Sequence, residues 1–309
     1  MKSGRSGLNG FLYDCHRRHD ENGYLKGIST ACQPPDQVFP DMSINIELLK
    51  TEIIASAEQE LLPGFRQSGG RKKADGSLVT DADLAVQHRL RQRLEAEYPH
   101  ISLLGEEMES EEQQRVLQDS AAGFWCLDPL DGTANYVAGM PCFATSLAYI
   151  RDGRVELGII YDPLRGECFH ATRGAGAWLN GEPLRLDNAT SQLGDCLAMV
   201  DFKRLSAPLA TRLAKQPPYR SQRSIGSVAL DWCWLAAGRL ELYLHGGSKL
   251  WDYAAGSLIF SEAGGSHRLT RGHVSTPDEV SLGLQPRMAI AAVNQALFET
   301  WNRWLEQFD

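Results

Sequence analysis

The chain has 309 residues, of which 43% are hydrophobic, and a formal net charge of -8 at pH 7. This length and apolar content predict a globular protein of one or two domains rather than a disordered chain. The negative net charge disfavours a broad nucleic-acid-binding surface, because such a surface needs clustered Lys and Arg. We therefore expect no nucleic acid as substrate.

The cellular location is predicted from what the sequence lacks. No apolar run approaches the roughly 18 to 20 residues that cross a bilayer, and the N-terminus lacks the apolar stretch of a secretion signal. Seven cysteines are scattered without a Cys-x-x-Cys pair, which is typical of a reducing compartment. These features predict a cytoplasmic protein without membrane contact. Residues 1–42 mix Gly, Arg, His and Pro without periodicity and are predicted to be a disordered N-terminal extension.

The predicted fold begins with two amphipathic helices. Apolar residues recur every fourth position from Leu49 to Leu61, which predicts a helix over 44–62 that ends at Pro63-Gly64. The segment Gly69–Lys73 follows, and its Gly and basic residues predict a flexible, solvated loop. Short apolar and acidic segments come next along the chain.

The second helix is predicted to begin near Thr80. The spacing from Thr80 to Asp83 fits a capping box, which by itself indicates a structural role. Asp83 lies three residues before Val86 and therefore on the same inward side of the helix. An acidic side chain thus faces the interior near a helix start.

Two short apolar runs predict strands that each end in acid. Glu106 and Glu107 follow the run Ile101–Leu104, and Asp128 follows the run Phe124–Leu127. Reacting groups in folds with helices and sheets often lie at such strand ends. The acids that follow Glu107 favour a solvated loop there, so the charge pattern alone does not choose between Glu106 and Glu107 as a site residue.

The segment Asp128-Pro129-Leu130-Asp131 predicts a metal site, because Pro129 bends the chain so that both carboxylates can face one ion. Glu106 and Asp252 also lie where a strand gives way to a turn or helix. Two like charges about 4 Å apart repel by roughly 4 kcal/mol at an effective dielectric near 20. Divalent cations remove this repulsion, and oxygen ligands favour Mg²⁺ or Mn²⁺ over Zn²⁺.

The next four residues, Gly132 to Asn135, are predicted to begin a helix whose free backbone N–H groups receive a phosphate. Hairpins are predicted over 142–180, including a turn at Asn180-Gly181. Residues 43–190 are therefore predicted to form an α+β domain with most of the expected metal ligands. Residues 191–309 are predicted to form an α/β domain with Asp252 and the substrate-specificity side. Its strands and helices are expected near 196–201, 207–215, 227–237, 240–244, 253–263, 289–293 and 295–307.

Four motifs in this chain resemble the inositol monophosphatase family, the lithium-sensitive sugar and nucleotide phosphatases. The resemblance covers about residues 45 to 295, and the motifs occur in family order at compatible spacings. Four such matches are far more specific than any single one. The motifs are Leu78-Val79-Thr80-Asp81-Ala82-Asp83, Gly105-Glu106-Glu107, Asp128-Pro129-Leu130-Asp131-Gly132-Thr133-Ala134-Asn135-Tyr136 and Trp251-Asp252-Tyr253-Ala254-Ala255-Gly256.

The resemblance implies a layered αβαβα fold, a homodimer and a hydrolase that acts on a small-molecule phosphate ester. It also implies two or three Mg²⁺ ions, which agrees with the clustered acids and with the chemistry of metal-assisted phosphoryl transfer. The metal ligands that it implies are Glu106, Asp128, the Leu130 carbonyl, Asp131 and Asp252.

By the same resemblance, Asp83 and Thr133 orient and activate a water molecule that attacks phosphorus in line, with no covalent enzyme intermediate. Glu106 belongs to this catalytic set as well as to the metal ligands. The phosphate and substrate contacts that the resemblance implies are Gly132, Thr133, Ala134, Asn135, Gly226, Ser227 and Val228.

The chain departs from the inositol-type pattern at His245, seven residues before Asp252, where such members carry a Glu. Imidazole replaces a fixed anion by a smaller donor or acceptor, so His245 is a candidate specificity residue. The context Lys73-x-Asp75-x-Ser77 resembles instead the branch that hydrolyses 3′-phosphoadenosine 5′-phosphate. Ala134-Asn135-Tyr136 follows the inositol type.

Several functions remain compatible with these residues. The leading hypothesis is hydrolysis of inositol 1-phosphate or a similar polyol phosphate. Alternatives with the same chemistry are a 3′(2′),5′-bisphosphate nucleotidase, a histidinol-phosphatase and a fructose-1,6-bisphosphatase. An alternative of another class is a regulatory protein that retains the phosphatase fold and binds the transcription or ribosome machinery, as some bacterial members do. The complete acidic set favours the enzyme.

Overall fold

The computed structural model describes residues 44–67, 69–73, 76–119, 123–187, 190–274 and 282–308. The extension predicted at 1–42 lies outside the described residues. Within them, no helix combines the length and the apolar character needed to cross a membrane.

Eight α-helices are found in the described residues, and most begin at a side-chain cap. Asn45, Thr80, Ser206, Ser227 and Asn294 each accept a hydrogen bond from the backbone N–H three residues on. The helices are α1 (Ile46–Ser56), α2 (Asp81–Glu97), α3 (Ser110–Gln118), α4 (Thr133–Ala138), α5 (Ala207–Lys215), α6 (Val228–Ala236), α7 (Leu250–Glu262) and α8 (Gln295–Leu305).

The first large sheet has seven strands in the order β3-β4-β5-β6-β7-β8-β9. Its first two strands are parallel and the other neighbours are antiparallel, as the predicted hairpins require. The strands are β3 (Ser102–Gly105), β4 (Phe124–Asp131), β5 (Ala144–Arg151), β6 (Arg154–Asp162), β7 (Glu167–Thr172), β8 (Ala177–Leu179) and β9 (Glu182–Leu184).

The second large sheet has five strands in the order β11-β10-β12-β14-β13. The strand β10 is parallel to both of its neighbours, whereas β14 is antiparallel to both of its own. The strands are β10 (Leu197–Asp201), β11 (Ser221–Arg223), β12 (Leu242–Ser248), β13 (Ser266–Thr270) and β14 (Arg287–Ala292).

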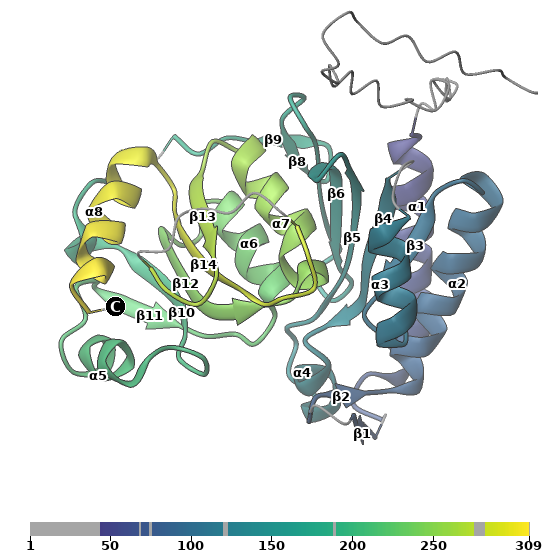
Figure 1. Cartoon of the computed structure of the whole chain (residues 1–309), viewed down its shortest axis with the longest axis horizontal. Coiled ribbons are helices and arrows are strands. Elements are labelled where there is room, and N and C mark those ends of the chain that lie inside the picture. Colours follow the sequence, from purple (N-terminus) through teal and green to yellow (C-terminus); the bar gives the residue numbers. More distant parts are fainter. Residues whose placement is uncertain are drawn as a thin grey trace, which may run out of the picture. The chain divides into compact units, whose positions relative to one another are not determined.

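The elements stack in five layers, as the αβαβα prediction requires (Figure 1). Helices α1 and α2 cover one face of the seven-stranded sheet, and α6 and α7 lie between the two sheets. Helices α5 and α8 cover the far face of the five-stranded sheet. The largest buried cluster lies around α6 and α7, so the middle layer is apolar nearly all round, which is typical of a fully enclosed helix.

Most predicted helices and strands are confirmed within a few residues. The helix predicted over 44–62 begins at Ile46, but its last turns are a π-helix (Ala57–Leu61) and a 3₁₀-helix (Leu62–Gly64). The helix predicted over 207–215 has those bounds. The Asn180-Gly181 turn joins β8 to β9 with positive φ at both residues.

Two local predictions are wrong. The acidic run expected as a surface loop contains α3, which packs against β3. The flexible loop expected at Gly69–Lys73 contains β1 (Arg71–Lys72), which pairs with β2 (Leu78–Val79). Charge and glycine content favoured loops at both places, and packing partners distant in the sequence ordered them instead.

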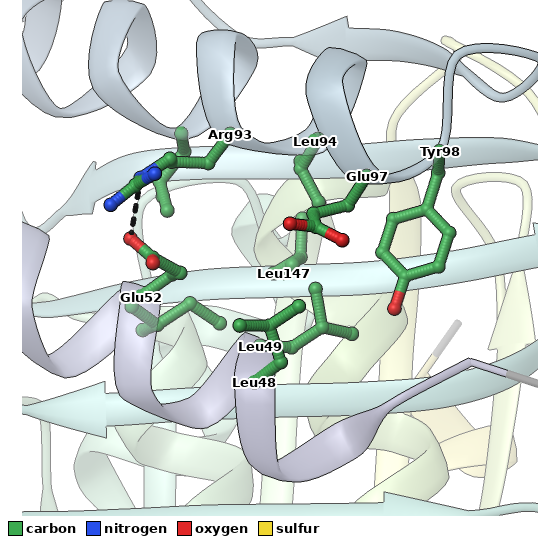
Figure 2. A pocket seen from close by; sticks show the side chains of 10 residues that line it. Leu48, Leu49, Glu52, Arg93, Leu94, Glu97, Tyr98 and Leu147 are labelled. Atoms are coloured by element: carbon green, nitrogen blue, oxygen red, sulfur yellow. Dashed lines mark hydrogen bonds and ion pairs between the residues drawn. The ribbon is translucent and has the colours of Figure 1, made fainter.

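Helices α1 and α2 enclose a small pocket over β5 with a volume of about 20 Å³ (Figure 2). Its lining is mostly leucine, with the Arg93 guanidinium 3.1 Å from a Glu52 carboxylate oxygen at its edge. The Tyr98 hydroxyl accepts a hydrogen bond from the Asn45 N–H at 3.0 Å, which ties the end of α2 to the start of α1. The volume is close to that of a single water molecule, so this pocket is a packing defect.

His267 on β13 packs in the central apolar cluster against Trp232 and Phe260, with ring centroids 5.3 and 6.4 Å away. Its Nδ1 lies 3.2 Å from the Ser261 hydroxyl. Burial lowers the pKa of His267 from 6.5 to about 4. The ring is therefore neutral in the folded protein at physiological pH.

We expect His267 to lower stability in acid. Below pH 6.5 the unfolded chain protonates this ring, whereas the folded protein does so only near pH 4, so the free energy of unfolding falls across that interval. The variant His267→Gln should lose part of this fall, measured by urea unfolding at steps from pH 7 to pH 4. The exposed His88→Gln is the matched control, and equal pH slopes for the two variants would contradict the assignment.

Candidate metal and phosphate site

The candidate site is built on the last residues of β4, which runs four residues beyond the predicted strand and includes Asp128 and Asp131. Residues three apart on a regular strand point to opposite faces. A β-bulge between Asp128 and Asp131 places the extra residue opposite β5, because Asp128 pairs with Ser146 and Asp131 pairs with Ala144. The bend predicted at Pro129 falls in this bulge, and both carboxylates reach the same side.

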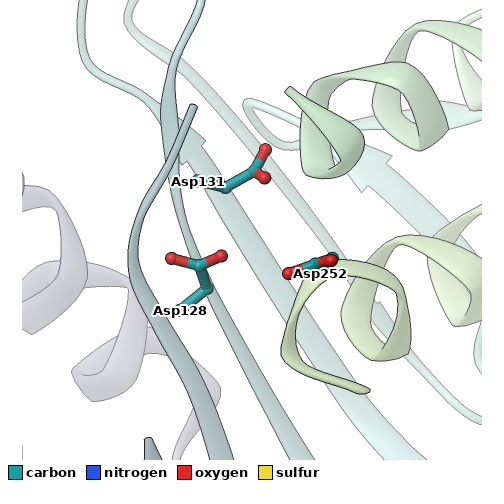
Figure 3. A group of neighbouring side chains, drawn as sticks. All are labelled: Asp128, Asp131 and Asp252. Atoms are coloured by element: carbon teal, nitrogen blue, oxygen red, sulfur yellow. The ribbon is translucent and has the colours of Figure 1, made fainter. Parts of the chain in front are cut away.

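Three carboxylates meet at this position. Asp128, Asp131 and Asp252 each offer an oxygen, and these oxygens lie within 4.8 Å of one another. Figure 3 shows the three side chains converging on a common space, two from β4 and one from the start of α7. Asp128 and Asp131 are buried, and Asp252 is partly exposed. The three carboxylates therefore form a compact group that could hold a metal ion.

Hydrogen bonds from helix starts hold the carboxylates in place. Asp131 Oδ2 accepts the Ser227 hydroxyl and, at 2.9 Å, the Ala229 N–H, so it docks on the N-terminus of α6. Asp252 Oδ2 accepts the Lys249 N–H at 2.7 Å and caps α7. Each of these two aspartates is thus fixed through its Oδ2 by donors at the start of a helix.

The carboxylates are electrostatically strained. Burial raises the pKa of Asp128 and of Asp252 well above the ordinary value, and the neighbouring carboxylates raise both further. Burial also raises the pKa of Asp131 to about 6, although Ser227 and Ala229 hydrogen bonds oppose it. A bound divalent cation would relieve this strain, and an all-oxygen donor set suits a hard cation such as Mg²⁺.

Asp83 and Thr133 are brought together from α2 and α4. The Thr133 hydroxyl lies 3.2 Å from Asp83 Oδ1 and 3.0 Å from the Leu130 carbonyl oxygen. Asp83 Oδ2 accepts the Thr80 N–H at 2.8 Å and the Thr80 hydroxyl at 2.5 Å. The capping box at Thr80 is thus present, and it leaves Asp83 Oδ1 for Thr133. Burial raises the pKa of Asp83 above its ordinary value despite these hydrogen bonds.

Glu106 follows β3, but its carboxylate is engaged by a residue that sequence reasoning assigned to a solvated loop. Lys73 Nζ donates to Glu106 Oε1 at 3.0 Å and to Glu107 Oε1 at 2.5 Å. The group of three aspartates does not include Glu106, so its role as a ligand stays a prediction. The sequence did not predict this pairing, because Lys73 lies 33 residues from Glu106 and the contact forms only in the fold.

The predicted phosphate segment begins α4 at Thr133, as expected. Gly132 caps this helix with φ at +90°, a conformation that favours glycine, and a Cβ there would lie 2.8 Å from the Cys142 carbonyl oxygen. Asn135 donates its amide to the carbonyls of Cys142 and Ile225, both at 2.7 Å. Asn135 therefore ties α4 to the chain before α6.

The predicted substrate residues of the second half lie at two places. Gly226, Ser227 and Val228 form the start of α6, where Ser227 also binds Asp131. His245 is buried near the end of β12 and lies outside the aspartate group. Predicted site residues from five separate segments thus lie near the end of β4 and the starts of α6 and α7. His245 lies on β12 of the five-stranded sheet.

Comparison with known proteins identifies the family of this chain. The sequence profile of the inositol monophosphatase family matches residues 41–306. The chain belongs to the inositol monophosphatase family. The resemblance carried by the four motifs is thereby confirmed.

Relatives and solved structures of this family share the fold. The protein named Nus factor SuhB of Pasteurella multocida is 38% identical over 197 residues, which cover 62% of this chain and 72% of that protein. The extragenic suppressor protein suhB of Bartonella henselae has a TM-score of 0.71 at 26% identity, covering 84% of this chain and 98% of that one. A structure of SaIMPase-II has a TM-score of 0.66 at 27% identity, covering 84% and 93%.

Replacing Asp252 by Asn is expected to stabilise the metal-free protein and to weaken its response to Mg²⁺. Asn keeps an oxygen for the Lys249 N–H and removes one charge, and two unit charges near 5 Å repel by about 3 kcal/mol at an effective dielectric of 20. The Tm in EDTA should rise and the further rise on adding Mg²⁺ should shrink. The exposed Asp195→Asn should change neither, and a lower Tm in EDTA for Asp252→Asn would contradict mutual repulsion.

Proposed function

We propose that this chain is a Mg²⁺-dependent phosphomonoesterase that hydrolyses a small phosphate ester, with inositol 1-phosphate or a similar polyol phosphate as the leading substrate. The observation that carries the proposal is the group of three carboxylates, whose oxygens lie within 4.8 Å of one another beside the Asp83–Thr133 pair. Family membership supports the reaction class, and a SaIMPase-II structure has inositol monophosphate bound.

In this proposal Asp128, Asp131, Asp252, the Leu130 carbonyl and Glu106 hold the cations. Bound Mg²⁺ would neutralise these oxygens and stabilise the negative charge that develops during phosphoryl transfer. Lys73 offsets part of the charge of Glu106 and Glu107, because its single ammonium lies within hydrogen-bonding distance of both carboxylates. Bound cations would neutralise the aspartates and the charge that remains at Glu106.

Asp83 and Thr133 carry the proton transfer. Thr133 orients a water molecule through its hydroxyl, and Asp83 Oδ1, 3.2 Å from that hydroxyl, accepts the proton that leaves the water. A raised pKa makes Asp83 a better proton acceptor than an exposed aspartate. The hydrogen bonds from Thr80 fix the other oxygen, so the acceptor cannot rotate away from Thr133.

The phosphate lies in this proposal against the chain that begins α4 and α6. Gly132, Thr133 and Ala134 lie directly after the two β4 aspartates, and Gly226, Ser227 and Val228 lie beside Asp131. His245 contributes to the choice of alcohol group. The segment that ends at Asn135 is held by the Cys142 and Ile225 carbonyls, which keeps its geometry fixed during binding.

A second candidate function is favoured by the names of the relatives. Proteins that are 35–38% identical to this chain are named Nus factors, which points to the transcription machinery. A regulatory role there would not require the metal site. The complete set of carboxylates favours hydrolysis as the primary function, and the two roles are compatible.

The reaction class is tested by phosphate release from inositol 1-phosphate, adenosine 3′,5′-bisphosphate, histidinol phosphate and fructose 1,6-bisphosphate. Turnover of at least one ester is expected with Mg²⁺, and none is expected with EDTA. Restored turnover after Mg²⁺ is returned to the EDTA-treated protein controls for unfolding. No release from any ester, or release that EDTA does not alter, would refute the phosphatase and leave the regulatory candidate.

The variant Asp131→Asn is expected to reduce kcat by at least about 100-fold, because removing one preorganised charged group from a phosphoryl-transfer site costs on that order. Asn keeps an oxygen for Ser227 and for the Ala229 N–H, so the start of α6 stays in place. Steady-state kinetics should be paired with circular dichroism. Turnover near that of the wild-type protein would show that Asp131 is not a ligand.

A further inference from the structure

A basic segment follows β10 beside the candidate site. The strands β10 and β12 are parallel, and Asp201 pairs in register with His245, so both strands end at the same edge of the five-stranded sheet. Lys203 and Arg204 follow Asp201 directly. The strand β12 continues from His245 into α7, which carries Asp252. The basic segment therefore follows a strand that pairs with β12, and β12 leads directly into the helix that carries Asp252.

Arg204 is held against β12. Its Nη1 donates to the Gly247 carbonyl at 2.8 Å. The backbone approaches closely here too, because a Cβ on Gly246 would lie 2.5 Å from the Arg204 carbonyl carbon. The Arg204 side chain is therefore fixed on the strand that leads into α7, whose first turn carries Asp252.

His245 adds no fixed charge at this edge. Its Nδ1 accepts the Gly247 N–H at 3.2 Å, so in the neutral ring the proton sits on Nε2. Nε2 lies 3.9 Å from Asp201 Oδ2. Burial lowers the pKa of His245 to about 4, so the ring is neutral near pH 7.

The Asp201 carboxylate forms its contacts within this edge of the sheet, whereas the charges of Lys203 and Arg204 are exposed. Asp201 Oδ1 accepts the Lys203 N–H at 2.8 Å, and Oδ2 faces His245. Lys203 and Arg204 are exposed, and neither forms an ion pair with a residue that the structure describes. Two cationic groups therefore stand beside the candidate site with their charges available to a ligand.

We propose that Lys203 and Arg204 bind a second anionic group of the substrate, so that the site selects phosphate esters that carry another phosphate or carboxylate. This inference rests on the proposed phosphatase function, and it ranks esters with a second anionic group above inositol 1-phosphate, which has one phosphate. Ammonium and guanidinium groups suit such anions, since both donate charge-assisted hydrogen bonds to them. The neutral His245 adds no negative charge at this edge, and the Asp201 carboxylate accepts a hydrogen bond from the Lys203 N–H.

The test compares esters that differ by one phosphate: fructose 1-phosphate with fructose 1,6-bisphosphate, and inositol 1-phosphate with inositol 1,4-bisphosphate. For wild-type protein with Mg²⁺ at low ionic strength, we expect kcat/KM to favour the bisphosphate of at least one pair by on the order of tenfold, because exposed pairs of charges contribute several-fold each. Salt at about 0.5 M should reduce this preference by screening. The difference should lie in KM.

Charge variants assign the preference to residues. Lys203→Gln should lower the bisphosphate-to-monophosphate ratio about fivefold, and Arg204→Gln should lower it by a similar factor. Lys203→Arg should restore most of the ratio. Lys215→Gln, which removes an exposed cation at the end of α5, is the matched control and should leave the ratio and the activity unchanged.

Three other results would each overturn this inference. Equal kcat/KM values within both pairs would overturn this inference while the proposed function stands. An unchanged ratio in both Lys203→Gln and Arg204→Gln, with any loss shared by all four esters, would reduce these residues to structural supports and overturn it as well. No hydrolysis of any ester would overturn the proposed function and this inference together.

Discussion

The site depends on the confinement of three carboxylates whose oxygens lie within 4.8 Å of one another. Their repulsion opposes folding, and burial strengthens it. Hydrogen bonds offset the cost: the start of α6 binds Asp131, the start of α7 binds Asp252, and the Leu130 N–H donates to Asp128 at 3.0 Å. Backbone donors at helix starts therefore make a concentrated negative charge tolerable before any cation binds.

The five-layer architecture explains why this confinement arises at the end of β4. The middle helices α6 and α7 are apolar on nearly all faces and are buried between the two sheets. Their N-termini therefore lie beside the bulged strand β4. On the other face of that strand, α2 contributes Asp83, which meets Thr133 from the adjacent helix α4. The site thus receives groups from both sides of the seven-stranded sheet without a separate binding loop.

In the proposed function the two sheets contribute differently. The seven-stranded sheet carries two of the three clustered carboxylates, which would act on the phosphoryl group common to every candidate ester. The five-stranded sheet presents His245 and the residues after β10, which we propose to contact the remainder of the substrate.

The sequence by itself determined the family and the layered fold, through the resemblance that the four motifs carry. It also determined the starts of α2 and α4 and the aspartates that cluster, because these depend on local signals such as a capping box and a Pro-containing motif. The tertiary structure alone decided which partners those groups take. Lys73 pairs with Glu106, Asp131 docks on α6, and Arg204 binds the Gly247 carbonyl. These contacts join segments tens of residues apart. They follow from sheet register and helix packing, which the periodicity of the sequence does not reveal.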